Sequence, residues 1–276
     1  MKHINEQKKI PQDLIGDIAI LKFSRETSKK EKNNLALNFL KKHTQIKTVL
    51  EKTGKIHGRL RKPELKFLAG ANKKEATYRE NGCIFKFNVD ETYFSPRLSW
   101  NRQVVADEIL KESKKIKKEK QIKILVMFAG VAPYPIVIAK KLKLAVKKAL
   151  IISSEINRSA CTYAKENVKL NKLEDYVLVI QGDSKKISEK LKKIKIKPEF
   201  DYIAMPRPNL KETFLKQALE LGKKGTKYYY HGFGTHESVL HEIMKDTSKK
   251  IRKISMRAAG EIGVRKYRWL AEFEKR

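Results

Sequence analysis

The chain has 276 residues, which suffices for one large domain or for a medium-sized domain with a smaller partner. Its 63 Lys and Arg residues outnumber 31 Asp and Glu residues, and the formal net charge is +32. Glutamate is not enriched in step with lysine, as it is in thermophile proteins, so the excess charge favours a polyanionic partner. Hydrophobic residues make up 41% of the chain, which allows a core and excludes wholesale disorder.

Cysteine and histidine usage argues against disulfide and metal chemistry. Cys83 and Cys161 are the only cysteines, too few for a disulfide framework or a zinc cluster. His231, His236 and His241 are spaced by five, which does not place them on one helix face. The N-terminus lacks an apolar signal region, and no stretch approaches the roughly 20 apolar residues of a membrane span. We therefore expect a cytoplasmic monomer with neither a metal nor a membrane partner.

Residues 1–92 predict a small, basic α+β domain suited to RNA binding. Residues 14–23 indicate a strand that is entered through a glycine turn. Ser28 and Glu31 form a capping-box pattern before a helix that runs to residue 43, and 46–50 indicate a second strand. A half-buried strand is indicated by alternating apolar residues at Cys83, Phe85, Phe87 and Val89.

Residues 93–121 predict a connecting motif and a helix. The motif is YFSPRLSWNR, at 93–102, and it leads into a helix. A charged run, KESKKIKKEKQ at 111–121, ends that helix and indicates a hinge before the next domain. The apolar positions of the helix are Val104, Val105, Ile109 and Leu110.

Residues 122–276 alternate between strands and helices, which is typical of an α/β, Rossmann-like domain. Such alternation predicts a mostly parallel, seven-stranded sheet with helices on both faces, and its last two strands would form an antiparallel edge. Pro133 begins the first helix at a favoured first-turn position. The expected strands are 122–127, 149–154, 176–180, 202–205, 227–231, 253–256 and 267–273. After the first helix, one helix is expected to end near residue 170, and two more are expected at 210–221 and 237–244.

The ends of the first three of these strands predict a nucleotide-like cofactor, because ligands bind at the carboxyl ends of parallel strands. The first strand runs into FAGVAP, where Gly130 lets a cofactor approach the backbone. Glu155 ends the second strand and is placed to accept hydrogen bonds from both ribose hydroxyls. Asp183 ends the third strand and is placed to accept one from an adenine amino group. This set favours S-adenosylmethionine over NAD, because the full G-x-G-x-x-G fingerprint is missing.

Six motifs resemble, in the same order, the archaeal and eukaryotic tRNA (guanine37-N1)-methyltransferases, a family of class I enzymes that use S-adenosylmethionine. The motifs are IGDIAIL, YRENG, YFSPRL, MFAGVAP, NVKLNKL and QGDS, and they cover most of the chain from about residue 14 to the fifth strand. Members of that family often carry an additional N-terminal domain that binds the tRNA elbow, and we expect that domain to be absent. The resemblance implies tRNA as the partner, bound at its anticodon stem-loop.

The resemblance also implies roles for individual residues. Arg79 would meet the tRNA or the target base, while Tyr93 and Arg97 would shape the guanine pocket, where an aromatic ring stacks and a guanidinium binds polar edges. Arg97 is thereby also a candidate catalytic residue. The expected cofactor contacts are Arg102, Phe128, Gly130, Val131, Glu155, Ile156, Asp183, Ser184 and Pro206.

Three positions depart from the family pattern. Asn101 stands where the family has a glutamate, the expected general base, and an amide cannot accept the guanine N1 proton. After the fourth strand the family's Asn-Leu-Pro or Asn-Pro-Pro is replaced by MPRP, which places Pro206 and Arg207 there, and Val126 replaces an acid. Arg207 is a candidate to stabilise an anionic guanine or to clamp a phosphate, but it is equally consistent with a solvated arginine in a rigid loop.

Three functions therefore remain open. The first is methyl transfer to the purine at position 37 of tRNA, either guanine N1 or a wyosine-type derivative, with the base splayed into the site. The second is transfer of the aminocarboxypropyl group of the same cofactor to a wyosine precursor. Transferases of that kind resemble FSPGN where this chain has FSPRL, so Arg97 favours methyl transfer. The third is a tRNA-binding homologue that has lost catalysis, an idea motivated by Asn101, Pro206 and Val126. If the function is methyl transfer, the basic stretches at 114–120 and 185–197 would bind phosphates of the tRNA.

Overall fold

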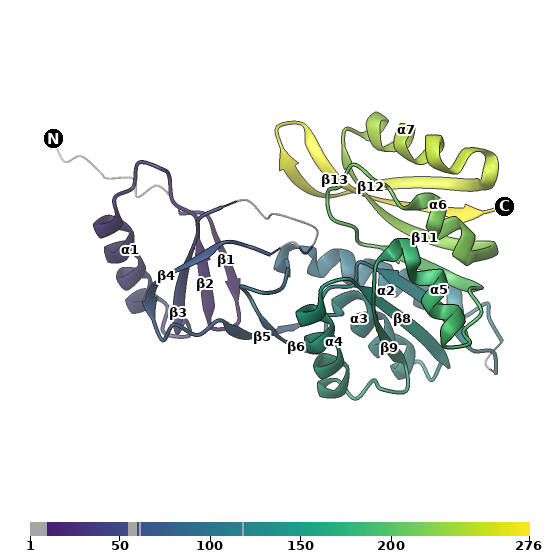
Figure 1. Ribbon diagram of the computed structural model, residues 1–276, viewed down its shortest axis with the longest axis horizontal. Helices are drawn as coiled ribbons and strands as arrows, with labels where there is room; N and C mark the ends of the chain where they lie inside the picture. Colours follow the sequence, from purple (N-terminus) through teal and green to yellow (C-terminus); the bar gives the residue numbers. More distant parts are fainter. Residues whose placement is uncertain (1–9, 55–59, 61, 118) are drawn as a thin grey trace. The chain divides into compact units, whose positions relative to one another are not determined.

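The structure is a computed structural model that describes residues 10–54, 60, 62–117 and 119–276. It divides into two compact units (Figure 1). The first unit contains the residues up to Arg79 together with Lys86–Pro96, and the second contains Glu80–Phe85 together with Arg97–Arg276. The expected connecting segment 93–121 is thus shared, because its first four residues fold with the first unit and the remainder with the second.

The first unit contains a four-stranded sheet covered by one helix. The strands β1 (Gln12–Ile15), β2 (Ile18–Leu21), β3 (Thr48–Lys52) and β4 (Leu65–Gly70) lie in the order β1-β2-β3-β4. The helix α1 (Lys29–Lys42) begins at the predicted cap, where the Ser28 hydroxyl accepts a hydrogen bond from the Glu31 amide at 3.2 Å. A glycine turn precedes β2 as predicted, but β1 before it and β4 were not predicted. The buried apolar residues between helix and sheet are Ala19, Leu21, Ala36, Ile46, Val49 and Ala69.

The turn between β1 and β2 requires glycine at position 16. Gly16 has φ +58°, and a Cβ atom there would lie 2.2 Å from the Thr77 carbonyl oxygen. We expect Gly16→Ala to destabilise the first unit by about 3 kcal/mol, because backbone strain adds to a collision with backbone. Gly82→Ala is the matched control, since Gly82 has φ +69° with no atom within 4 Å of its added Cβ. Amide hydrogen exchange measures the loss, in β2 and β3 for Gly16→Ala and in β6 for Gly82→Ala; equal effects of the two substitutions would contradict the expected collision.

The second unit is built on a seven-stranded sheet of the predicted Rossmann-like type. Its order is β12-β13-β11-β10-β7-β8-β9, and the five strands from β11 to β9 are parallel. The chain extends from β7 toward β9 on one side and from β10 toward β12 on the other, which makes the boundary between β7 and β10 the topological switch point. The strands are β7 (Ile122–Met127), β8 (Ala149–Glu155), β9 (Val177–Gln181), β10 (Phe200–Met205), β11 (Gly222–Gly234), β12 (Ile251–Gly263) and β13 (Lys266–Lys275).

Helices cover both faces of this sheet. The core on one face joins strand residues to α5 (Ile187–Lys193), α6 (Leu215–Leu221) and α7 (His236–Thr247). The other face carries α2 (Ser99–Ser113), α3 (Pro133–Leu144) and α4 (Arg158–Leu170). The antiparallel end of the sheet is confirmed, because β13 pairs antiparallel with both β11 and β12. Three details differ from prediction: α5 was not predicted, α6 begins five residues later than expected, and β11 and β12 are longer.

A short hairpin fixes part of the YRENG motif to the second unit. Its strands are β5 (Glu75–Glu80), which was not predicted, and β6 (Cys83–Asn88), which was. Asn81 and Gly82 both have positive φ, as a two-residue type I′ hairpin turn requires. The Asn81 amide donates to the Ser99 carbonyl oxygen at 3.2 Å, and the Asn171 side chain exchanges two hydrogen bonds with the Ile84 backbone. The hairpin tip is therefore anchored to α2 and to the end of α4.

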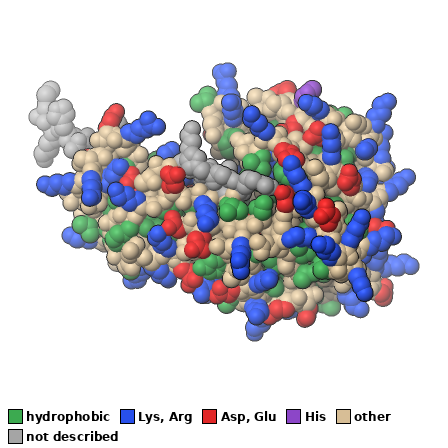
Figure 2. Space-filling view, viewed as in Figure 1, with side chains coloured by type: hydrophobic (Ala, Val, Ile, Leu, Met, Phe, Trp, Pro, Cys, Tyr) green, Lys and Arg blue, Asp and Glu red, His purple; other side chains and the backbone are tan. Residues whose placement is uncertain are grey.

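The surface is strongly basic, and Figure 2 shows Lys and Arg side chains distributed over the visible face of both units. None of the described helices is both long and apolar enough to cross a membrane. A broad positive surface of this kind attracts a polyanion without by itself selecting a sequence.

Candidate active site

The loop that follows β7, residues 128–132, has an unusual backbone, and we call it the cofactor loop. Phe128, Gly130 and Ala132 all have positive φ, at 58°, 58° and 67°. Left-handed backbone is costly for residues other than glycine and is concentrated at functional sites. A buried side chain holds the loop in place, because the Asn167 amide donates to the Val131 carbonyl oxygen at 3.1 Å. Asn167 belongs to the NVKLNKL motif, whose purpose the sequence did not reveal.

Glu155 joins the ends of three neighbouring strands. One of its carboxylate oxygens accepts a hydrogen bond from the Gly130 amide at 2.8 Å, and the other accepts one from the Asn157 amide at 2.8 Å. Its carbonyl oxygen accepts from the Gly182 amide at 2.7 Å. Burial raises the pKa of Glu155, and the hydrogen bonds from Asn157 and Gly130 oppose that rise. The Ile156 amide also lowers this pKa by hydrogen-bonding the carboxylate, which has about four acceptor sites and so retains one for a hydroxyl group.

The other expected cofactor residues lie at the carboxyl ends of the same strands. Asp183 follows β9 and caps a short 3-10 helix, η2 (Ser184–Lys186), by accepting from the Lys185 amide at 3.0 Å. Pro206 directly follows β10, and Ile156 directly follows Glu155 at the end of β8. The fold therefore brings together, along one edge of the sheet, Phe128, Gly130, Val131, Glu155, Ile156, Asp183, Ser184 and Pro206.

Arg102 has a structural partner that the sequence did not suggest. Its guanidinium donates two hydrogen bonds to the carboxylate of Glu80, each at 2.5 Å. Both side chains are buried, with exposed fractions of 2% and 3%. The pair joins α2 to the tip of the β5–β6 hairpin. Arg102 was expected beside the cofactor, whereas the structure shows it in a bidentate ion pair with Glu80. The sequence hinted at this pair only through the presence of Glu80 within YRENG.

A buried pair also supports the first turn of α3. The Tyr134 hydroxyl lies 3.0 Å from Nε2 of His231 on β11, and the two rings are nearly perpendicular. Burial, reinforced by the positive charges of Arg268 and Arg207, lowers the pKa of His231 to about 3, so this histidine is neutral at physiological pH. A neutral histidine can hydrogen-bond the tyrosine without placing a further charge in the core. The pair ties the helix that follows the cofactor loop to β11.

The residues expected to handle the substrate are found in both units. Arg79 is exposed on β5, and Tyr93 is half-buried; both belong to the first unit. Arg97 is exposed in a 3-10 helix, η1 (Pro96–Leu98), that precedes α2 in the second unit. Asn101 is buried, and its amide donates to the Ala259 carbonyl oxygen at 3.1 Å, which ties α2 to β12.

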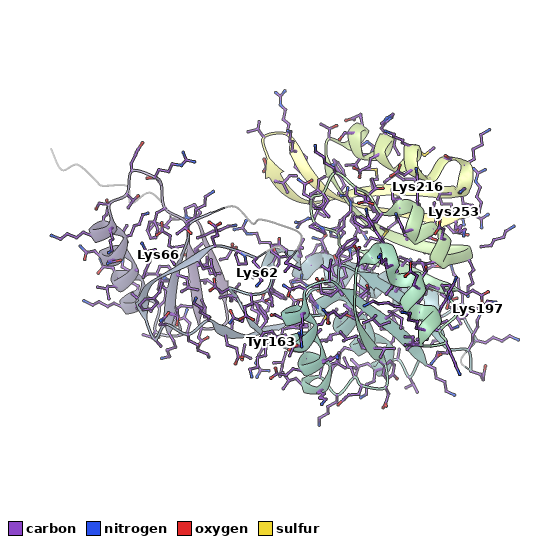
Figure 3. All side chains as sticks on the ribbon, in the orientation of Figure 1. Lys62, Lys66, Tyr163, Lys197, Lys216 and Lys253 are labelled. Carbon is purple, nitrogen blue, oxygen red and sulfur yellow. The ribbon has the colours of Figure 1, made fainter. Side chains whose placement is uncertain are left out.

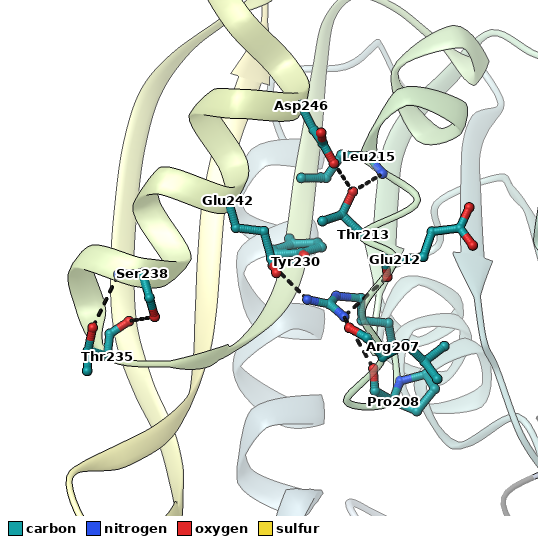
Figure 4. Close-up of polar contacts among 11 residues, drawn as sticks. Arg207, Pro208, Glu212, Thr213, Leu215, Tyr230, Thr235, Ser238, Glu242 and Asp246 are labelled. Atoms are coloured by element: carbon teal, nitrogen blue, oxygen red, sulfur yellow. Dashed lines mark hydrogen bonds and ion pairs between the residues drawn. The ribbon is translucent and has the colours of Figure 1, made fainter. Parts of the chain in front are cut away.

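Arg207 is buried rather than solvated, with a side chain that is 1% exposed (Figure 4). Its guanidinium pairs with the carboxylate of Glu242 on α7 at 2.6 Å and donates to the Leu210 carbonyl oxygen at 2.9 Å. The guanidinium also lies 4.9 Å from the centre of the Tyr230 ring, and the Tyr230 hydroxyl donates to Glu242. The alternative of a solvated arginine in a rigid loop is therefore wrong: these contacts hold the loop 206–214 against β11 and α7.

Sheet order, cofactor loop and acidic strand ends together define a methyltransferase domain of the Rossmann-like class. The chain belongs to the TRM5/TYW2 methyltransferase family, because the TRM5/TYW2 methyltransferase domain matches residues 76–261. The TYW2 N-terminal domain matches residues 5–73. The predicted family and the predicted fold class are both confirmed.

Individual relatives agree with this assignment. The chain is 35% identical, over 93% of its own length and 96% of the relative's, to the tRNA (guanine(37)-N(1))/4-demethylwyosine(37)-methyltransferase Taw22 of Nanoarchaeum equitans. The crystal structure of Trm5b from Pyrococcus abyssi has a TM-score of 0.76 at 30% identity, covering 96% of this chain and 74% of that one. The structure of aTrm5 in complex with tRNALeu has a TM-score of 0.80 at 24% identity, covering 97% and 72%, which supports the fold.

Proposed function

We propose that the protein transfers the methyl group of S-adenosylmethionine to the purine at position 37 of tRNA. The observation that carries the proposal is the hydrogen bond between Glu155 and Gly130, which joins the strained cofactor loop after β7 to the proposed ribose-binding acid at the carboxyl end of β8. The relative from Nanoarchaeum equitans is named for guanine and for 4-demethylwyosine at this position, which supports both targets.

The residues along this edge fit the proposed cofactor. Glu155 would supply an acceptor for the ribose hydroxyls, and Asp183 would supply one for an adenine amino group. Phe128, Val131, Ile156, Ser184 and Pro206 would line the same site. The sulfonium of the cofactor would supply an electrophilic methyl group, so the protein's task is mainly to position the base and remove one proton.

On the substrate side, Arg97 would bind the polar edges of the target base, Tyr93 would stack on it, and Arg79 would contact the RNA. Asn101 cannot remove the N1 proton, because an amide is not a base and its nitrogen is committed to Ala259. We therefore assign Asn101 and Arg207 to positioning. The guanine N1 proton must be accepted by a base other than Asn101. The expected partner is the anticodon stem-loop, and we further propose that the enzyme is a cytoplasmic monomer.

A second function is favoured by one observation. The first unit matches the TYW2 N-terminal domain. A relative from Methanocaldococcus jannaschii that is 28% identical is named tRNA(Phe) (4-demethylwyosine(37)-C(7)) aminocarboxypropyltransferase. Transfer of the aminocarboxypropyl group from the same cofactor therefore stays the alternative, although Arg97 favours methyl transfer. Loss of catalysis is the third possibility, supported by the structural commitments of Asn101 and Arg207.

The test is transfer to an unmodified tRNA that carries guanine at position 37, with S-adenosylmethionine labelled separately in its methyl and aminocarboxypropyl groups. We expect the methyl label on guanine 37, identified by mass spectrometry of the nucleosides. A tRNA with adenine at that position is the control and should acquire no label at N1. Aminocarboxypropyl label on 4-demethylwyosine tRNA would establish the second function. Binding of both tRNAs without any transfer would contradict the proposal and leave an RNA-binding protein.

A further inference from the structure

A polar pocket of about 440 Å³ lies between the loop that follows β10 and helix α7, beside the Arg207–Glu242 pair (Figure 4). All its walls belong to the second unit. Polar groups dominate the lining, so an apolar ligand would leave them without hydrogen-bond partners. The basic and aromatic side chains of the lining are Lys211, Phe214, Lys216, His241 and Lys245.

The acids of the pocket are engaged within the protein. Glu212 pairs with Lys185 at 2.8 Å, and Glu242 pairs with Arg207 at 2.6 Å. The remaining acid, Asp246, accepts a hydrogen bond from the Thr213 hydroxyl. Two of the three negative charges are therefore compensated by cations of neighbouring segments.

The cations of the pocket are not engaged in this way. Lys211, Lys216 and Lys245 are exposed, and none has an ion-pair partner among the residues that the structure describes. Lys216 lies at the start of α6 (Figure 3), whereas His241 and Lys245 follow each other by four residues on α7 and so share one helix face. The pocket therefore presents a net positive charge with several N–H donors, which suits a compact anion.

The pocket adjoins the expected cofactor site. Phe214 lines the pocket and packs edge to face on Phe128 of the cofactor loop, with ring centres 5.0 Å apart. Lys185, which follows Ser184 in the chain, lies 5.9 Å from the centre of the same Phe214 ring. One aromatic side chain thus separates the basic pocket from the cofactor loop.

We propose that this pocket binds a backbone phosphate of the substrate RNA next to the target nucleotide. The inference rests on the proposed function, since it assigns the anion to an RNA strand that enters the site beside the cofactor loop. A phosphate held here fixes the register of the strand without reading its sequence. The Arg207–Glu242 pair positions the wall that carries Lys211, which gives the buried arginine a role in substrate binding that needs no contact with the base.

The test compares two double variants. Lys216→Ala with Lys245→Ala removes two cations of the pocket, and Lys148→Ala with Lys224→Ala removes two exposed lysines at the opposite, amino edge of the same sheet. The affinity for tRNA is measured over a range of KCl concentrations. The affinity for S-adenosylmethionine is measured at a single KCl concentration. We expect the pocket variant to bind tRNA about tenfold more weakly and to lower the slope of log K against log salt by about one, with cofactor affinity unchanged. The control should lose less than about twofold in tRNA affinity.

Equal losses in the two double variants would overturn the inference, as would an unchanged salt slope in the pocket variant. Inorganic phosphate at constant ionic strength is the second arm. If it binds the wild-type pocket while the pocket variant keeps full tRNA affinity, the site serves a free anion and the inference fails. The proposed function fails separately: if wild-type protein binds tRNA but transfers no methyl group, the salt-slope comparison still decides whether RNA occupies the pocket.

Discussion

Replacing Glu155 with alanine is expected to weaken the binding of S-adenosylmethionine by about a hundredfold or more. The substitution removes the proposed acceptor for the ribose hydroxyls, and a hydrogen bond to a charged group contributes about 1.5–3 kcal/mol. It also removes the acceptor of the Gly130 amide, so the cofactor loop loses its tie to β8. Isothermal titration calorimetry with the full chain measures the loss.

Two further variants make the result specific. Glu220→Ala removes an exposed acid from α6 and should leave cofactor affinity unchanged. Glu155→Gln keeps the shape but turns an amide NH₂ toward the N–H of Gly130 or Asn157, so it should lose affinity as well. Full affinity in the glutamine variant would mean that the carboxylate does not bind the ribose.

The pH dependence of cofactor affinity in the wild type checks the charge state of the Glu155 carboxyl. Because burial raises the pKa of Glu155 above its ordinary 4.5, the carboxyl becomes protonated at a higher pH than an exposed acid does. Cofactor affinity should therefore fall as the pH is lowered, starting above pH 4.5. The pH dependence of fold stability runs in the opposite direction. Because the pKa of Glu155 is raised in the folded state, its contribution to stability is present at low pH and is lost as the pH rises through that pKa. Acid unfolding and acid loss of binding are thus distinguishable.

Replacing Arg102 with methionine is expected to destabilise the second unit by about 3–5 kcal/mol, because it leaves the Glu80 carboxylate buried without a counter-charge. For a unit of this size that loss corresponds to a decrease in Tm of about 10 °C. Urea unfolding followed by the fluorescence of Trp100 and Trp269, both in this unit, measures it.

The double variant Arg102→Met with Glu80→Met tests the cause. Without either charge, burial of two apolar side chains should recover most of the lost stability, since replacing a whole buried pair is often neutral. Lys111→Met, an exposed position on the same helix, should change stability by less than about 0.5 kcal/mol. If the double variant were as unstable as Arg102→Met, the loss would come from packing, and the ion pair would not be its cause.

Much of the second unit follows from local patterns. Residues 122–127 form β7 with the predicted bounds, because an apolar run interrupted only by Lys123 and followed by a glycine loop indicates a buried parallel strand. Glu155 lies at the end of β8 as predicted, after the apolar run at 149–152. The strand β5 escaped prediction because EATYRE offers only Ala76 and Tyr78 as apolar positions, and its last residue is buried by an ion pair. Its burial depends on a residue that lies 22 positions away in the chain.

The sequence by itself determined the alternation of strands and helices, the strand ends at which a cofactor binds and the excess of positive charge. These are properties of short segments, where the period of apolar residues and the position of glycine are decisive. Only the tertiary structure decided which polar residues hold the molecule together. Arg102, Asn101 and Arg207 look like site residues in the sequence, but each finds its partner on a distant segment: Glu80, Ala259 and Glu242. Burying a polar group is favourable only when a partner meets it, and that partner is set by how the segments pack.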